Sequence, residues 1–140
     1  MSAEAEREQL LESVGFVVLG AVPEAGGVTP GQVWRAAVNL GAEPAVRVDA
    51  EADDAVERAE QTWRNRADEL GFFAPDGSFL ISLPGPGAFE APWLRVRGGV
   101  GFLPALGDSK DFVSMAISGP PALAVTEEEW EFWILDVVPQ

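Results

Sequence analysis

Residues 50–83 read AEADDAVERAEQTWRNRADELGFFAPDGSFLISL, and the change of pattern inside this stretch decides the fold. Its first part repeats apolar residues at spacings of four and three, which places them on one face of an amphipathic helix over 50–70: Ala52, Val56, Ala59, Trp63, Ala67 and Leu70. We expect Asp49 to cap this helix and Gly71 to end it. The charged residues on the opposite face are expected to be solvated.

From Gly71 onward the chain consists of short apolar runs separated by proline and glycine, a pattern typical of an antiparallel meander. We expect a turn at 75–77, followed by a strand over 79–83. A strand over 93–97 is expected to pair back with 100–103 across a turn at Gly98 and Gly99. Further strands are predicted at 112–117 and 122–125.

The amino-terminal part contains two more helices and two short strands. Ser2 is placed to cap a helix over 3–14, and Thr29 with Gln32 forms a capping box at the start of a helix that Gly41 ends. The runs 16–22 and 44–48 read as strands, the first of them buried. The sequence therefore predicts one α+β domain over 1–140, in which amino-terminal helices (about 3–14, 30–40 and 50–70) pack on a carboxy-terminal antiparallel sheet (about 72–138).

The segment 126–138 fits two secondary structures. Thr126 and Glu129 match a capping box, which favours a helix. Trp130, Phe132 and Ile134 alternate as in a strand, and the segment is rich in the aromatic and β-branched residues that strands prefer. We expect a strand.

The composition limits the chemistry available to the chain. It contains no histidine, cysteine or tyrosine, and has 23 acidic against 9 basic side chains. Imidazole bases, thiol nucleophiles and the usual ligands of zinc and copper are therefore missing, although carboxylate chemistry is not. We predict no catalytic residues, no metal site and no cofactor, and a non-enzymatic role is favoured.

The net charge of −14 bears on partners and location. It repels phosphates and anionic lipids, so nucleic acid and membranes are not expected as partners, whereas a basic protein is attracted. The amino terminus lacks the pattern of a secretory signal and no run is long enough to span a membrane, so we expect a cytoplasmic protein.

The most suggestive local patch is TEEEWEFW at 126–133, where acidic and aromatic residues alternate. Aromatic anchors and oriented charges are common in protein interfaces. We predict a docking edge for a basic partner, made of Glu127, Glu128, Glu129, Trp130, Glu131 and Trp133. The alternative is that the aromatics belong to the core and the glutamates to its solvated exterior.

A second candidate is a ligand site on the strand over 93–97. Trp93, Arg95 and Arg97 would share one face and hold an anion by charge and stacking. The alternative is that the arginines pair across the sheet with acids such as Glu129 and Glu131. The cluster over 108–111 includes Ser109 and Lys110 but matches no strong catalytic or metal motif, and a hydrophilic turn explains it.

These observations favour a non-enzymatic acidic binding protein, such as an inhibitor, immunity-type protein or adaptor, that engages a basic protein. A small enzyme or small-molecule-binding domain is the alternative, with an aromatic pocket between the long helix and the sheet and carboxylate or arginine chemistry. Burial of aromatic strands against a second copy of the chain is a third possibility.

Overall fold

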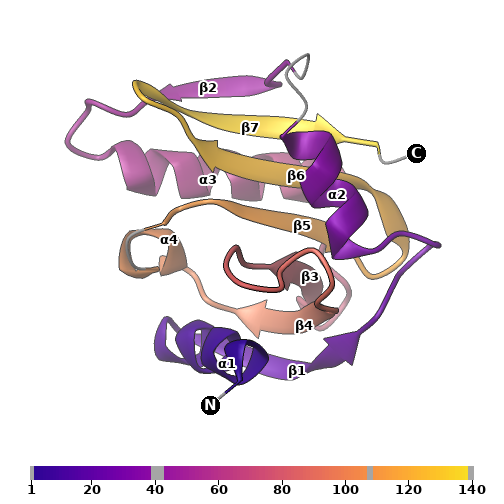
Figure 1. The fold of residues 1–140 in the computed structure, drawn as a ribbon. Helices are drawn as coiled ribbons and strands as arrows, with labels where there is room; N and C mark the ends of the chain where they lie inside the picture. Colours follow the sequence, from indigo (N-terminus) through magenta and orange to yellow (C-terminus); the bar gives the residue numbers. More distant parts are fainter. Residues whose placement is uncertain (1, 39–42, 107–108, 139–140) are drawn as a thin grey trace.

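A computed structural model describes residues 2–38, 43–106 and 109–138. Its centre is a seven-stranded antiparallel sheet with the order β1-β4-β3-β5-β6-β7-β2 (Figure 1). The strands are β1 (Phe16–Val22), β2 (Val46–Asp49), β3 (Phe79–Ser82), β4 (Trp93–Gly98), β5 (Phe112–Ala116), β6 (Gly119–Glu127) and β7 (Glu131–Val137). The helices are α1 (Ala3–Ser13), α2 (Pro30–Ala37), α3 (Ala55–Glu69) and α4 (Phe102–Ala105). The predicted α+β class is confirmed.

Helices cover both faces of the sheet, with α3 behind β5 to β7 and α2 in front of them in Figure 1. The larger core cluster joins α1, α3 and α4 to one set of alternate strand residues, and Trp63 is fully buried within it. The smaller cluster joins α2 to the other set, including Leu80, Trp93 and Met115. The long helix therefore packs on one sheet face, as its apolar periodicity predicts.

The sheet extends beyond the expected range, because both of its edges come from the amino-terminal half. β1 pairs with β4, and β2 pairs with β7, so the sheet is not confined to 72–138. β1 is also not the buried strand that its apolar sequence suggests, since Phe16 is its only buried residue. Its place at the edge and a register shift between Val18 and Gly20 leave most of its length exposed.

The long helix begins later than predicted. Asp49 belongs to β2, and its carboxylate accepts a hydrogen bond from the amide of Glu51 at 2.9 Å, which favours a turn instead of a helix start. The helix begins at Ala55, and its cap residue Asp54 makes no side-chain capping bond. Gly71 follows its end with a φ of +71°, as the sequence predicts.

The predicted hairpin at Gly98 and Gly99 is wrong. Both glycines have positive φ, but the chain continues into the short helix α4, and β4 pairs with β1 and β3 instead. The amide of Gly99 donates to the carbonyl of Gly15 at 3.1 Å, which ties this segment to the entry of β1. The start of α4 is held by Glu60, whose carboxylate accepts from the amides of Gly101 and Leu103 at 2.7 and 2.8 Å.

Other local predictions are confirmed. Ser2 caps α1, and Thr29 with Gln32 forms the capping box of α2. The segment 126–138 is strand, as expected, but a turn divides it into the end of β6 and β7. The predicted helix end at Gly41 lies outside the described residues. No helix in the described ranges has both the length and the apolar character needed to cross a membrane.

Candidate functional site

The turn between β6 and β7 carries an exposed group of acidic and aromatic side chains. We call Glu127, Glu128, Glu129 and Trp130 the acidic tip. All four are exposed, and Trp130 is 61% exposed. The amide of Glu128 donates to the carbonyl of Glu131 at 2.8 Å, so the four residues lie in one tight turn.

Two backbone contacts attach the acidic tip to neighbouring segments. The carbonyl of Trp130 accepts from the amide of Ala50 at 2.9 Å, and the carboxylate of Asp111 accepts from the amide of Glu127 at 2.7 Å. Asp49 and Asp111 therefore lie beside the tip and add to its charge. The sequence alone does not show that these acids lie beside the tip. They are distant from it along the chain, and only the strand register brings them together.

The environment of the tip changes the ionisation of Asp111. Burial raises the pKa of Asp111, the hydrogen bond from the amide of Glu127 partly offsets this, and the charge of Glu128 makes a smaller contribution that raises it. Two cations belong to the neighbouring segments: Arg47 lies 3.9 Å from Glu131, and Lys110, next to Asp111, donates to the carbonyl of Pro104 at 3.1 Å. The tip is thus an acidic surface that a cationic group can approach from solvent.

The side chains of Glu131 and Trp133 are engaged with each other and with Arg47. The indole of Trp133 donates to the carboxylate of Glu131 at 3.2 Å, and the Arg47 guanidinium lies over its ring at 5.4 Å. Phe132 is buried in the core, whereas Trp133 is half-buried. Of the three aromatics in the patch, only Trp130 is exposed.

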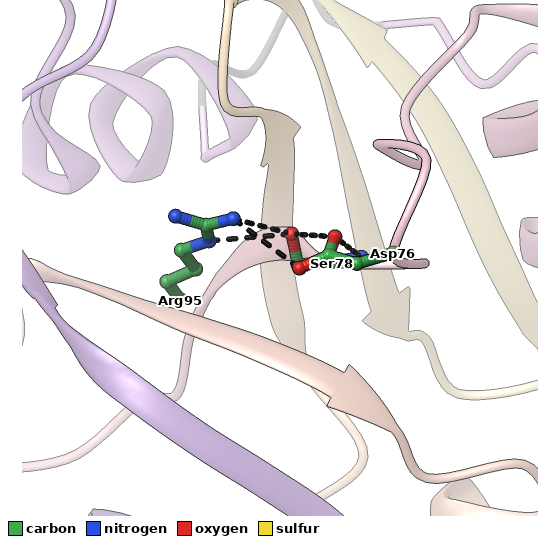
Figure 2. A network of polar contacts seen from close by, with 3 residues as sticks. All are labelled: Asp76, Ser78 and Arg95. Carbon is green, nitrogen blue, oxygen red and sulfur yellow. Dashed lines mark hydrogen bonds and ion pairs between the residues drawn. The ribbon is translucent and has the colours of Figure 1, made fainter.

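The arginine candidate forms a small polar network on β4, shown in Figure 2. The Nε and Nη2 atoms of Arg95 donate to the hydroxyl of Ser78 at 3.2 and 3.1 Å, and Nη2 lies 3.4 Å from Asp76. Asp76 accepts from the hydroxyl and the amide of Ser78 at 2.6 and 2.9 Å. These bonds, followed by the charge of Arg95, lower the pKa of Asp76. The network fixes the turn before β3 and engages the Nε and Nη2 atoms of Arg95.

The other two members of the predicted ligand site are placed differently. Trp93 is fully buried, and its indole donates to the carbonyl of Val28 at 3.1 Å, so its ring offers no stacking surface. Arg97 is exposed at the end of β4. The predicted pairing of these arginines with Glu129 or Glu131 is wrong, because β3, β5 and β6 lie between β4 and β7.

Aromatic rings fill the space between α3 and the strands β3 and β5. Trp63 packs against Phe79, Phe102 and Phe112 with ring centroids 5.2 to 5.8 Å apart. These side chains occupy the place where the alternative hypothesis puts an aromatic ligand pocket. In the 108–111 cluster, Asp108 lies outside the described residues, and the amide of Asp111 donates to the Ser109 hydroxyl at 3.4 Å.

No protein-family model matches the chain, and neither a curated protein nor a solved structure matches it.

Proposed function

We propose that the protein is a non-enzymatic acidic binding protein, of the inhibitor, immunity-type or adaptor kind, that engages a basic protein through the acidic tip. One observation carries the proposal: Trp130 is 61% exposed at a tight turn that also presents three exposed glutamates. Exposing a tryptophan to water is unfavourable, and tryptophans at the centre of interfaces often dominate binding energy.

The electrostatics of the tip support a cationic partner. Asp49 and Asp111 flank the tip, and Arg47 is engaged by Glu131. A partner that presents lysines or arginines around an apolar pocket would meet both the ring and the carboxylates. Nucleic acid and membranes are not part of this proposal, because a charge of −14 repels both. A cytoplasmic setting remains part of it.

The proposal is tested by affinity capture from a lysate of the source cells with three immobilised proteins. They are the wild type, a tip variant with glutamine at Glu127, Glu128 and Glu129, and a control variant with glutamine at Glu4, Glu6 and Glu12. The control removes the same charge from exposed positions of α1. We expect a basic protein to bind the wild type and the control at low salt and to be lost from the tip variant.

A second variant separates the ring from the charge. Trp130→Ala is expected to weaken the captured complex by about 30-fold, the effect of a hot-spot residue of about 2 kcal/mol. Binding should also weaken as salt is raised, because exposed charges are screened. Equal capture by the tip and control variants, or capture that does not change with salt concentration, would refute the proposal.

A further inference from the structure

A groove runs between the edge strand β2 and the helix α3. It has a volume of about 470 Å³, within the usual size range of ligand sites. Figure 1 shows β2 at the free edge of the sheet, with α3 on the face behind it. The groove is lined by Ala45, Val46, Thr62, Asn65, Arg66 and Glu69.

The strand side of the groove offers unpaired backbone groups. β2 ends the strand order, and within the described ranges it pairs with β7 alone. An edge strand presents a row of amide donors and carbonyl acceptors to any extended segment that lies beside it. Val48 packs in the core cluster of α3, so by alternation Val46 also lies on the helix side of β2. An added strand would therefore point every second side chain into the groove.

The helix side of the groove sets the charge. Arg66 is held by the carboxylate of Asp136 through Nε at 3.0 Å and through Nη2, and by Glu69 at 3.0 Å. One cation is thus surrounded by two carboxylates, and the Glu69 side chain is 65% exposed. The groove lining alone is neutral, with Arg66 and Glu69 as its two charged residues, and Asp136 beside Arg66 brings the local charge to −1. The exposed carboxylate of Glu69 is the acceptor that a lysine or arginine can reach.

We propose that this groove, here named the β2–α3 groove, binds an extended basic segment of a protein partner by strand addition to β2. Main-chain hydrogen bonds to the edge would supply affinity, and alternate lysine or arginine side chains would reach Glu69 between Thr62 and Asn65. The inference rests on the proposed function in that the partner is basic, but it concerns a surface distinct from the acidic tip.

The test uses two synthetic peptides with blocked ends, one alternating lysine with valine over six residues and one alternating glutamate with valine. Amide chemical shifts of the full chain are followed as each peptide is added at low salt. The lysine peptide is expected to shift the amides of 45–49 and 62–69. The glutamate peptide is expected to cause no saturable shift in these ranges.

Matched variants locate the peptide. Asn65→Trp fills the groove, whereas Gln61→Trp lies one turn earlier, and both lose the same hydrogen bond from Gln61 to Asn65. We expect Asn65→Trp to weaken lysine-peptide binding at least tenfold and Gln61→Trp to leave it unchanged. Glu69→Gln should weaken it about threefold, and Glu57→Gln, an exposed position on the same helix, should not.

The tip variant keeps the two proposals distinguishable. The groove inference stands if the tip variant binds the lysine peptide as tightly as the wild type and if Asn65→Trp weakens that binding. This holds even when no lysate partner requires the tip. Shifts confined to 127–131, equal binding of both peptides, no binding at millimolar peptide, or an unaffected Asn65→Trp variant would each overturn it.

Discussion

Trp63 is the residue on which the larger core cluster depends. Its ring touches aromatic neighbours on α4, β3 and β5, and its indole donates to the hydroxyl of Ser114 at 2.9 Å. Ser114 in turn donates to the carbonyl of Leu123 at 3.1 Å. A buried tryptophan at a helical core position is predictable from periodicity, but its partner on β5 is not, because serine in a strand gives no sign of burial.

We expect Ser114→Ala to lower the free energy of unfolding by about 1–3 kcal/mol, because it leaves the buried indole N–H of Trp63 without an acceptor. In a Trp63→Phe background the same substitution should cost less, since no indole remains to satisfy. Urea unfolding of the four proteins of this double-mutant cycle measures the difference. Equal costs in the two backgrounds would show that the hydrogen bond is unimportant.

The pKa of Asp111 predicts how the stability of the protein changes with pH. Its folded pKa is raised above the ordinary value of 3.8, mainly by burial, so the native state binds this proton more tightly than the unfolded chain. The stability that Asp111 contributes therefore falls as pH rises from 3.8 through the raised pKa. Asp111→Asn should be more stable than the wild type at pH 7, and this advantage should disappear below pH 3.8.

Urea unfolding at pH 7 and pH 3 checks this expectation, with Asp53→Asn at an exposed position as the control. Asparagine can still accept the hydrogen bond from Glu127, so the comparison isolates the charge. An advantage of Asp111→Asn that is the same at both pH values would contradict the assignment.

At the scale of elements, the short helix α4 depends on one buried side chain, that of Glu60. Glu60 is buried, accepts from two amides at the start of α4, and binds Nε of Arg64 at 3.0 Å. Glu60 is one of the charged helix residues that the sequence predicts to be solvated, and it is buried instead. Glu60 is buried because the glycines after β4 turn the chain toward α3.

We expect Glu60→Ala to destabilise the protein by about 3 kcal/mol. The substitution leaves the mostly buried Arg64 without its ion-pair partner and removes the acceptor of the first amides of α4. Glu57→Ala, on the exposed face of the same helix, should stay within about 0.5 kcal/mol of the wild type. Urea unfolding gives both values, and hydrogen exchange should accelerate at the amides of Gly101 and Leu103. Unchanged exchange at these amides would rule out the capping role.

The elements also show which patterns in the sequence were sufficient. Thr29 with Gln32 placed the start of α2 correctly, because a capping box is a local device. The hairpin predicted at Gly98 failed, because two glycines permit a turn without specifying what pairs across it. For the acidic tip, the sequence shows the consecutive residues from Glu127 to Trp130, but the contributions of Asp49 and Asp111 depend on the strand register.

At the scale of the whole molecule, the charge of −14 sets a general dependence on salt. Self-repulsion opposes the compact state, and raising the salt from 0.02 to 0.5 M shortens the screening length from roughly 20 Å to roughly 4 Å. We expect the urea midpoint to rise with sodium chloride over this range. A midpoint that stays constant or falls would mean that ion pairs such as Arg66 with Asp136 outweigh the net repulsion.

The two sheet edges have a consequence for synthesis on the ribosome. β2 is made early, but its neighbour β7 is among the last residues of the described chain, and the register pairs Asp49 with Glu131. At ordinary translation rates, β2 waits roughly 4 to 16 s before that partner emerges. During this interval both edges of β2 are unpaired in the nascent chain. We therefore expect chaperones to bind this segment while translation continues.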